Sequence, residues 1–403
     1  MKRILIFSLA YVPYIGGAEL AIKHVTDRLD PNEYSFDMIT LRFDRNLPKV
    51  ERVGNVTVHR IGFTAHNAKV SDRSLPWQCR LAKLLFPFTA FLKAIFLYRQ
   101  NKYDATWALM ANQAGFAALF FKYAHPNTPY FLELQDGTPL SSMTARRRIL
   151  YPLWWLYKEI YLKANVIKTI SHFIEKITRE TGYAGKVFVI PNGVDVAKFS
   201  APIPEEKLTE LKMLFNKRMG EVFVVTVSRL VLSRGVEDII QALVYLPKHV
   251  KLLIAGNGED REKLHHIAIG LKVDDRVIFA GHIDHSELPA YFKISDIFVR
   301  PSLIEGFGSA FVEAFAAGIP VVATPVGGIP DFLTDGATGL FCEVQDPQSV
   351  AHAVMRYTDD PALVARIVAN ARKLVAEKYD WNSIAKGMKE KVFEPLMKQG
   401  HNV

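Results

Sequence analysis

Residues 305–324 constrain the fold more than any other stretch, because they join a glycine-bearing turn, a helix and a strand. They read EGFGSAFVEAFAAGIPVVAT. The turn at 305–308 opens directly into a helical run that carries Glu313, and Gly318 and Pro320 end this run before a β-branched segment. Turn, helix, glycine stop and strand in this order form an α/β unit that presents a helix N-terminus to an anion. The stretch therefore predicts an α/β fold with an anion site at the turn.

Strand and helix patterns alternate along the whole chain. In the second half, strand candidates lie at 222–227, 250–255, 276–279 and 296–300, with helical runs at 235–245, through Ile269 and at 288–293. In the first half, strand candidates lie less regularly at 4–9, 36–41, 56–61, 105–109, 129–134, 166–170 and 187–190. Alternation of this kind predicts doubly wound parallel sheets.

The length of 403 residues exceeds one compact core, so we expect two domains. The segment 190–207 holds several turn formers and prolines and shows no helical period, which is typical of an interdomain linker. We therefore predict a first domain over residues 1–197 and a second domain from residue 198.

Cysteine and histidine usage argues against disulfides and metal sites. Cys79 and Cys342 lie far apart and match no metal-ligand or CxxC spacing, and the twelve histidines show no ligand spacing either. A reducing cytoplasm is the expected compartment. The pair His265 and His266 is expected to lie on an exposed helix.

Neither a leader nor a membrane span is predicted. The apolar run at 3–10 follows basic residues but lacks a small-x-small cleavage pattern, and we interpret it as the first buried strand. The nearest approach to a membrane-spanning run, at 84–98, is interrupted by Pro87 and Lys93.

The net charge of +9 is unevenly distributed. Residues 1–200 hold 27 basic and 15 acidic side chains, whereas residues 201–403 hold 23 and 26. An excess of positive charge in the first half suits an anionic partner. No nucleic-acid-binding motif accompanies the charge, so nucleic acid is not expected as that partner.

Two basic, aromatic stretches at 76–103 and 144–163 belong to this positive half. Such segments suit a bilayer interface, where rings lie at headgroup depth and cations meet acidic lipid. In the alternative interpretation the rings belong to the core and the cations are solvated. An anionic membrane surface is therefore one expected partner.

Two arginines, Arg229 and Arg234, flank the turn after the first strand of the second half. Ligands of doubly wound sheets bind at the carboxyl ends of strands, where these side chains would project. Two guanidinium groups there suit a diphosphate, although a solvated surface pair is the alternative. Glu305 and Glu313 are placed to accept hydrogen bonds from hydroxyl groups beside the phosphate. A nucleotide sugar would provide partners for both carboxylates and both arginines.

A glycine pair near the N-terminus, Gly16 and Gly17, follows the first predicted strand in the segment PYIGGAE at 13–19. It is similar to a phosphate-approach loop that opens a helix. The segment is not a GxGxxG motif and has no Walker lysine, so on its own it leaves a phosphate site and a structural turn equally open.

Together these segments resemble the retaining, family 4-type glycosyltransferases of the GT-B architecture, the glycosyl transferases of group 1. The matching segments are GGAE at 16–19, IPNGVD at 190–195, SRLVLSRG at 228–235, IAGNGED at 254–260, FVRPSLIEGFGSAFVEAFAAGIPVVATPVGGIPD at 298–331 and DGATGLF at 335–341. The resemblance implies two Rossmann-like domains that face each other across a cleft. It implies that residues 198–380 bind the donor, and that residues 381–403 cross back to complete the acceptor-binding domain at 1–197.

The resemblance also implies an activity and a set of roles. The activity is transfer of a hexosyl unit from a nucleoside diphosphate sugar to an acceptor hydroxyl, with retention of configuration and without a metal or other cofactor. Glu305 is expected at the sugar hydroxyls, Glu313 at the ribose hydroxyls, and the main chain of 282–283 at the base. The implied donor-binding residues are Gly16, Gly17, Arg229, Arg234, His282, Ile283, Glu305, Gly306, Phe307, Gly308 and Glu313. The implied catalytic residues are Arg229, Arg234, Glu305 and Asp136.

The sequence departs from the family pattern at two positions. Arg234 stands where family members usually carry lysine, which keeps the charge but changes its geometry. Gln135 stands where many members carry a histidine near the acceptor, and an amide cannot exchange a proton near neutral pH. We expect Gln135 and Asp136 at the acceptor, with Asp136 the nearer polar partner.

The acceptor and two other functions remain open at this stage. A lipid-linked or saccharide acceptor is expected, in cell-surface polysaccharide or glycolipid synthesis, by an enzyme on the inner face of the cell membrane. The alternatives are a nucleotide-sugar epimerase of the same architecture and a non-catalytic nucleotide-sugar-binding module, the latter suggested by Gln135.

Overall fold

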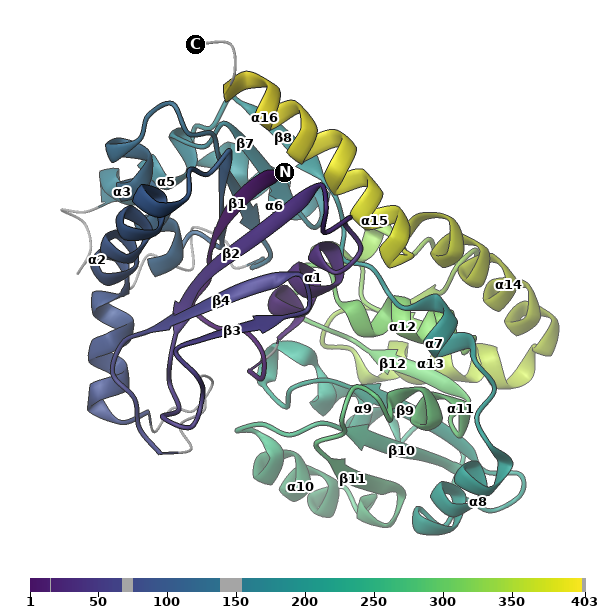
Figure 1. The fold of residues 1–403 in the computed structure, drawn as a ribbon. Coiled ribbons are helices and arrows are strands. Elements are labelled where there is room, and N and C mark those ends of the chain that lie inside the picture. Colours follow the sequence, from purple (N-terminus) through teal and green to yellow (C-terminus); the bar gives the residue numbers. More distant parts are fainter. Residues whose placement is uncertain (15, 67–74, 138–153, 401–403) are drawn as a thin grey trace. The chain divides into compact units, whose positions relative to one another are not determined.

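The computed structural model describes residues 1–14, 16–66, 75–137 and 154–400 of the chain (Figure 1). Residues 144–153 of the second basic, aromatic stretch lie outside these ranges. The chain divides into two compact units, Met1–Asn192 with Trp381–Val403, and Gly193–Asp380. Residues 193–197, which the sequence assigned to the first domain, therefore fall in the second unit.

The first unit is built on one largely parallel sheet. Its strands are β1 (Lys2–Phe7), β2 (Tyr34–Leu41), β3 (Val50–Val53), β4 (Val56–Ile61), β5 (Ala105–Leu109), β6 (Tyr130–Leu134), β7 (Val166–Thr169) and β8 (Lys186–Val189). They lie in the order β3-β4-β2-β1-β5-β6-β7-β8, and only β3, on the edge, runs antiparallel to its neighbour. Starting from β1, the chain first adds strands on one side of the sheet and then, from β5 onward, on the other side. The topological switch point of this doubly wound sheet therefore lies between β1 and β5.

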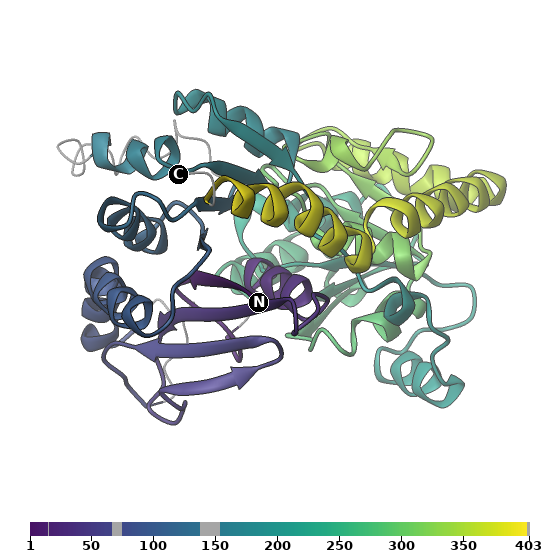
Figure 2. The same cartoon turned by 45° about the horizontal axis from the view of Figure 1, so that its top comes forward.

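Helices cover both faces of this sheet. They are α1 (Gly17–Thr26), α2 (Trp77–Gln100), α3 (Gln113–Ala124), α5 (Trp154–Leu162), α6 (His172–Glu180), α15 (Trp381–Met388), the π-helical turn η5 (Lys389–Phe393) and α16 (Glu394–Gly400). Ile4 and Ile6 of β1 face one core with Trp381 and Phe393, whereas Phe7 contacts Phe121 of α3 on the other face. This alternation follows from the two-residue period of a strand. Figures 1 and 2 show the C-terminal helices lying along the first sheet.

Helix α2 differs from what its sequence predicted. It runs unbroken for 24 residues through Pro87, and by length and composition it meets the test for a membrane-spanning helix. Pro87 removes one intrahelical hydrogen bond, yet it is buried beside Phe86 and Ala90, so packing holds the helix together across it. The expectation that proline and lysine interrupt this run was wrong.

The second unit contains a parallel sheet of its own. Its strands are β9 (Val222–Val227), β10 (Val250–Ala255), β11 (Val277–Gly281), β12 (Ile297–Arg300), β13 (Val321–Ala323) and β14 (Leu340–Phe341). They lie in the order β11-β10-β9-β12-β13-β14, with the switch point between β9 and β12. This is the 3-2-1-4-5-6 order of a Rossmann fold, as the alternating pattern of the sequence predicted.

The second unit's helices include α12 (Ser309–Ala317), whose residues 310–317 are all buried. The others are α7 (Val196–Ser200), α8 (Glu205–Leu214), η2 (Leu232–Arg234), α9 (Val236–Ala242), α10 (Arg261–Gly270), η3 (Asp274–Arg276), α11 (Leu288–Lys293), η4 (Ile329–Asp331), α13 (Pro347–Asp359) and α14 (Pro361–Lys378). The helix predicted after the turn at 305–308, and its stop at Gly318, are thus confirmed.

The boundary between the two units, between Asn192 and Gly193, lies within the predicted linker 190–207, but the expectation that this segment contains no helix was wrong. Helix α7 occupies its middle and α8 begins at Glu205. The Asp195 carboxylate caps α7 by accepting a hydrogen bond from the Lys198 N–H at 2.9 Å, and Phe199 is fully buried. Capping and one buried ring thus stabilise a helix too short to show a period.

Candidate active site

The switch point of the second sheet brings two loops together. One loop follows β9 and carries Arg229 and Arg234, and the other follows β12 and carries Glu305. Since β9 and β12 are adjacent and parallel, both loops leave the same edge of the sheet. Ligands of open α/β sheets bind at this position.

Two glycines, one after β9 and one after β13, allow close backbone contact with the loop after β12. Gly235 has a φ of +66°, and a Cβ there would lie 1.9 Å from the Pro301 carbonyl oxygen. Gly327 has a φ of +58°, and a Cβ would lie 1.8 Å from the Glu305 carbonyl oxygen. The next residue, Gly328, donates its N–H to that same oxygen at 3.0 Å. Only glycine allows backbones to approach this closely, and these contacts fix the backbone position of Glu305.

The carboxylate of Glu305 accepts hydrogen bonds from two arginines. Arg234 Nη1 donates to its Oε2 at 2.7 Å, and Arg300 Nη2 donates to the same oxygen at 2.8 Å. Glu305 and Arg300 are both buried, whereas Arg234 is half-buried. Arg300 also donates to the Val227 carbonyl at 3.1 Å and lies over the Phe311 ring at 4.3 Å. The carboxylate orientation is therefore set from beneath by Arg300 and from the side by Arg234.

The charges around Glu305 leave a positive excess. Burial lowers the pKa of Arg300, although a guanidinium stays protonated throughout the accessible pH range. Arg229 is exposed at the same loop. Arg234 and Arg300 both pair with Glu305, which leaves one positive charge uncompensated by this carboxylate, and the exposed Arg229 adds a second on the loop after β9. A diphosphate diester carries two negative charges, which matches this excess.

Glu313 lies in α12 and is held by a different pair. Its Oε1 lies 2.9 Å from His285 Nε2, and Lys198 Nζ lies 3.2 Å from His285 Nδ1 and 2.9 Å from the His285 carbonyl oxygen. An ammonium can only donate, so Nδ1 must be the acceptor and Nε2 must carry the proton that points to Glu313. His285 is thus a neutral imidazole that orients the Glu313 carboxylate.

The segment between the two glutamates presents its backbone. Gly308, with a φ of +88°, is the N-cap of α12. The ring of Phe307 is buried against Phe332 and Tyr379, at centroid distances of 5.3 and 5.8 Å. Phe307 can therefore offer a ligand only its main chain, and Gly306 precedes it in the same loop.

The base-contacting segment predicted at 282–283 follows β11, at the same edge of the sheet as the β9 and β12 loops. The His282 side chain is exposed, with Nε2 3.8 Å from Asp284 Oδ1. Ile283 is half-buried. Because the loop is partly exposed, its main chain is accessible to a ligand.

In the first unit, Gly16 and Gly17 lie at the N-terminus of α1. The Gly16 N–H donates to Glu19 Oε2 at 2.8 Å, so this donor is already engaged. Burial raises the pKa of Glu19. A Cβ on Gly17 would meet nothing within 4 Å. The open side of this turn is therefore at Gly17 rather than at Gly16.

Gln135 belongs to a buried polar network at the carboxyl end of the first sheet. Its Nε2 donates to Glu133 Oε1 at 2.6 Å, and its Oε1 accepts from Asn192 Nδ2 at 2.9 Å. Lys168 Nζ also donates to Glu133 Oε1 at 2.6 Å, in an ion pair that is almost fully buried. Both ends of the Gln135 amide are thus engaged within the unit, whereas the neighbouring Asp136 is exposed.

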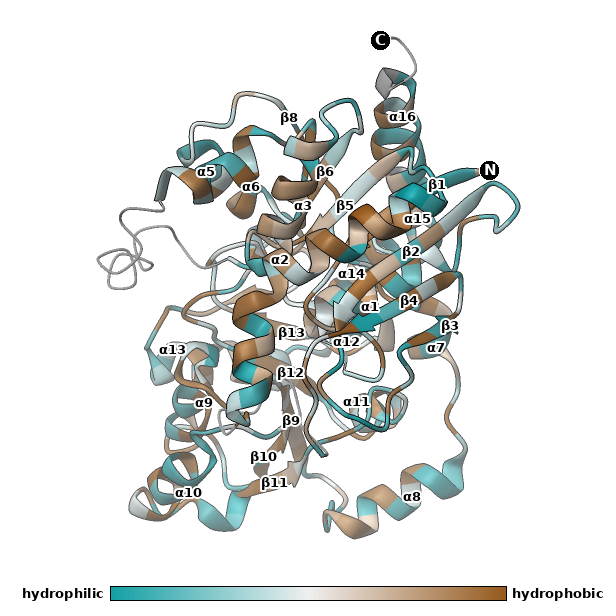
Figure 3. Cartoon of the chain, turned by 60° about the vertical axis from the view of Figure 1, so that its left-hand side comes forward, coloured by the Kyte–Doolittle hydropathy of each residue, from teal (hydrophilic) through white to brown (hydrophobic). Residues whose placement is uncertain are grey.

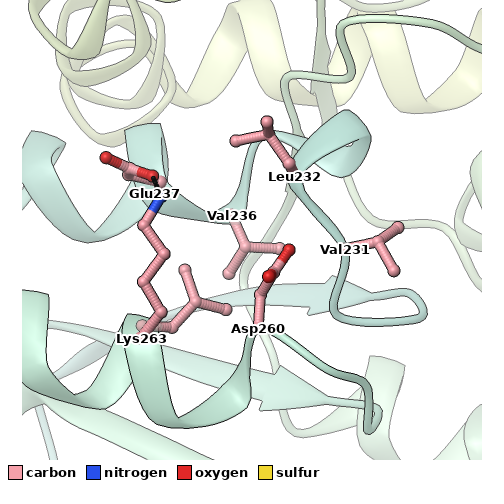
Figure 4. Close-up of a pocket in the computed structure, with 7 residues that line it drawn as sticks. Val231, Leu232, Val236, Glu237, Asp260 and Lys263 are labelled. Carbon is pink, nitrogen blue, oxygen red and sulfur yellow. Dashed lines mark hydrogen bonds and ion pairs between the residues drawn. The ribbon is translucent and has the colours of Figure 1, made fainter.

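Two further features concern metal ions and small pockets. In the part of the chain that the structure describes, no group of three His, Cys, Asp or Glu side chains is placed to hold a metal ion. A small pocket in the second unit has apolar walls from Val231, Val236 and Leu264, and a Lys263–Glu237 ion pair of 2.7 Å lies along it (Figure 4). Its lining carries Lys263 against two carboxylates, Glu237 and Asp260, so it has no positive charge to spare for an anion, and it contains neither Arg229 nor Glu305.

Sequence reasoning missed several residues of these networks. Arg300 could have been identified from the sequence, because it is a charged residue at the end of an otherwise apolar strand. Glu133 and Lys168 are likewise charged residues in the otherwise largely apolar strands β6 and β7. His285 and Lys198 carried no such signal, because they are 87 positions apart and meet only in the folded unit.

Two family models match the chain. The model described as "Glycosyl transferases group 1" matches residues 210–374, and the model described as "Glycosyl transferase 4-like domain" matches residues 16–193. Together they cover both structural units and every predicted donor-binding residue.

Individual proteins match along nearly their full length. An uncharacterised glycosyltransferase of Methanocaldococcus jannaschii is 28% identical over 392 residues, which is 95% of this chain and 96% of the relative. The solved structure of sucrose-phosphate synthase from Thermosynechococcus elongatus has a TM-score of 0.79 at 22% identity, covering 97% and 98% of the two chains. Anabaena HepE, in complex with UDP and glucose, has a TM-score of 0.76 at 20% identity, covering 97% and 99%. These structures share the fold of this chain.

Proposed function

The chain belongs to the group 1 glycosyltransferases of GT-B architecture, and on this premise we propose that it moves a hexosyl unit from a nucleoside diphosphate sugar to an acceptor hydroxyl with retention of configuration. The observation that carries the proposal is the cluster at the switch point of the second sheet. There, Glu305 is held by Arg234 and Arg300 beside the exposed Arg229.

This cluster suits departure of a diphosphate leaving group. Negative charge develops on the diphosphate oxygens as the bond to the sugar breaks, and preorganised guanidinium groups stabilise it without reorganisation. Arg229 and Arg234 would supply this stabilisation and Glu305 would bind the sugar hydroxyls. Arg300 would keep Glu305 in place, which makes Arg300 a positioning residue. Retention is supported by the family resemblance alone.

The nucleoside side of the donor is assigned to Glu313. A carboxylate that accepts from two vicinal ribose hydroxyls forms a specific pair of charge-assisted hydrogen bonds. His285 and Lys198 hold this carboxylate on the wall of the site, and the main chain of 282–283 would contact the base. UDP in the Anabaena structure supports a nucleoside diphosphate as the leaving group. No metal is required by this scheme, because arginines neutralise the diphosphate.

The acceptor is proposed to bind the first unit. Asp136 is exposed and follows β6. Both ends of the Gln135 amide are already hydrogen-bonded, because the amide joins Glu133 to Asn192. Asp136 would therefore contact the acceptor hydroxyl and Gln135 would act through the network. A lipid-linked or saccharide acceptor, in cell-surface polysaccharide or glycolipid synthesis in the cytoplasm, is consistent with the positive charge of this half.

A donor screen tests the proposal. Thermal unfolding of the chain is followed with UDP-, GDP- and ADP-sugars, and the true donor raises the midpoint because it binds only the folded state. The stabilising sugar nucleotide is then incubated alone and with saccharide or lipid-linked acceptors, and the products are separated. Conversion of the sugar without acceptor would indicate an epimerase. Donor binding with neither transfer nor slow hydrolysis would indicate a non-catalytic module.

A further inference from the structure

Helix α2 has two apolar faces on opposite sides. The inner face packs against α3 and β2, and Cys79, Phe86 and Leu97 are among its buried residues. The outer face is an exposed stripe whose members recur mostly every four residues and are each between 53% and 69% exposed. The stripe consists of Trp77, Leu84, Phe88, Leu92 and Phe96. A helix needs only one such face to pack in its domain, so the outer stripe is available to another apolar phase.

The charge along α2 itself has one sign. Residues 76–103 contain no aspartate or glutamate, whereas their basic residues are Arg80, Lys83, Lys93, Arg99 and Lys102. Lys93 Nζ lies 5.0 Å from the Phe96 ring centroid, and Lys102 Nζ lies 4.3 Å from that of Tyr98. Long basic side chains of this kind lay their methylenes on apolar surface and extend their charge to a headgroup.

The stripe continues onto neighbouring helices of the same unit. α2 packs on α3, and α3 packs on α5. Phe88 of α2 stacks on Phe120 of α3 at a centroid distance of 5.5 Å, and Tyr123 and Trp155 add exposed rings from α3 and α5. Figures 1 and 3 show these three helices as one layer of the first unit, with hydrophobic residues along the length of α2.

We propose that this face docks on a bilayer that carries acidic lipid, with α2 lying along the interface. The opposite face of α2 is core, so the helix cannot span the membrane without unfolding its own unit. A helix with a buried face, an apolar stripe and basic flanks suits an interfacial position. Interfacial rings such as Trp77 lie at headgroup depth, where their apolar and polar parts are both satisfied.

The charge pattern favours lipid over a second copy of the chain. A twofold symmetric dimer through this face would set its basic residues against the same residues of the partner, with no acidic side chain in 76–103 to neutralise them. An acidic bilayer supplies the missing negative charge and the apolar phase together. For the proposed function, docking would bring the first unit to lipid-linked acceptors.

Vesicle flotation of the full chain tests this proposal. Wild type should float with vesicles of phosphatidylcholine and phosphatidylglycerol, and its binding should weaken with salt. The double variant Leu84→Gln/Leu92→Gln should lower the partition coefficient by about tenfold or more, because two apolar side chains no longer enter the lipid. The matched control is Met213→Gln/Leu214→Gln, which removes two equally exposed apolar side chains from α8 of the second unit.

A charge-only pair separates the electrostatic part. Lys83→Gln/Lys93→Gln should lower binding to acidic vesicles by about fivefold per residue and leave binding to neutral vesicles unchanged. Its control is Lys248→Gln/Lys373→Gln, exposed lysines of the second unit. Tryptophan emission should shift to the blue with acidic vesicles, and the shift should be smaller in Trp77→Phe, in which Trp155 is the remaining exposed tryptophan of the face.

Three results would overturn the proposal. One is an absence of wild-type flotation with acidic vesicles. Another is flotation that Leu84→Gln/Leu92→Gln leaves unchanged although circular dichroism shows it folded. The third is a concentration-dependent dimer in light scattering that the same variant abolishes, since a second copy would then cover the stripe. Thermal shifts with the sugar nucleotide, measured on the same variants, keep failure of this inference distinct from failure of the proposed donor site.

Discussion

The carboxyl ends of the two sheets each contain a buried glutamate paired with a cation, and they use it differently. In the second unit, Glu305 is paired with Arg300 and also with the half-buried Arg234. In the first unit, Glu133 is paired with Lys168 alone and takes its second partner from the neutral Gln135. The second unit therefore keeps a surplus of positive charge for a ligand, whereas the first unit's pair is neutral.

The two pairs also differ in how completely they are satisfied. Each carboxylate accepts two hydrogen bonds through one oxygen, but the other oxygen of Glu133, Oε2, is buried without a hydrogen-bond partner among the residues that the structure describes. Asn192 Oδ1, beside Gln135, lacks one in the same part of the chain. Buried atoms without a hydrogen-bond partner among the described residues also occur at the switch point of the second sheet, where they are Arg300 Nε, Ser228 Oγ and Ser302 Oγ. A surplus of positive charge therefore distinguishes the candidate anion site, and a buried ion pair alone does not.

The largest expected effect is on stability and tests this difference directly. Lys168→Met leaves Glu133 buried without a cation and should lower the free energy of unfolding of the first unit by roughly 3–5 kcal/mol. Arg300→Met leaves Arg234 on Glu305 and should cost less, about 1–3 kcal/mol. All five tryptophans lie at positions 77, 107, 154, 155 and 381, within the first unit. Urea unfolding by tryptophan fluorescence should therefore shift for Lys168→Met, and circular dichroism should detect Arg300→Met. Equal costs for the two variants would contradict the comparison.

The next effect is on catalysis. Arg229→Ala should lower kcat/KM for transfer by about 10²–10³-fold, because one donor to the leaving diphosphate is lost. Since Arg229 is exposed, the unfolding midpoint should stay where it is in wild type. Arg366→Ala, which removes an exposed arginine of α14, is the matched control. Turnover equal to wild type for Arg229→Ala would remove the diphosphate role from this residue.

A smaller effect comes from a third carboxylate, Asp238 of α9, which has no cation to offset its burial. Burial, with Glu237 and Asp346 nearby, raises the pKa of Asp238 to about 6 from 3.8. The folded state then holds this proton more tightly than the unfolded state, so stability falls as pH rises from about 4 to about 6. Asp238→Asn should recover about 1–2 kcal/mol at pH 7 and almost nothing at pH 4, as measured by urea unfolding with circular dichroism. The same gain at both pH values would show that ionisation is not the cause.

The smallest effect concerns donor affinity. His285→Gln removes the imidazole that orients Glu313 and should raise the KM for the donor by about three- to fivefold with kcat unchanged, because ribose binding is shared by ground and transition states. His266→Gln, on the exposed α10, serves as the control. A fall in kcat at constant KM would instead place His285 at the reacting centre.

Much of the donor site was predictable because its residues are close in sequence. Glu305 and Glu313 lie on one loop–helix unit, and Gly318 ends that helix as expected. Arg229 and Arg234 follow a strand whose β-branched pattern is clear. The Rossmann order of the second sheet follows from regular alternation of strand and helix. Local signals of this kind survive without knowledge of distant contacts.

Other features could not be predicted. The run through Pro87 was expected to break, yet packing of its inner face keeps α2 continuous. The helix α7 was hidden in a turn-rich segment because one cap and one buried ring decide it. The amide of Gln135 joins Glu133 to Asn192, and Asn192 lies 57 positions away from Gln135 along the chain. Each of these outcomes depends on partners that the local pattern does not contain.

The sequence by itself determined the α/β class, the family and the loop that carries Glu305, because glycine turns, strand periods and helix stops are local properties of the chain. Only the tertiary structure decided that Arg300 lies beneath Glu305, that Lys198 sets the tautomer of His285, and that one apolar face of α2 is core while the other is exposed. The physical reason is that burial and hydrogen bonding depend on distances in space. Those distances are set by packing of segments that are remote along the chain.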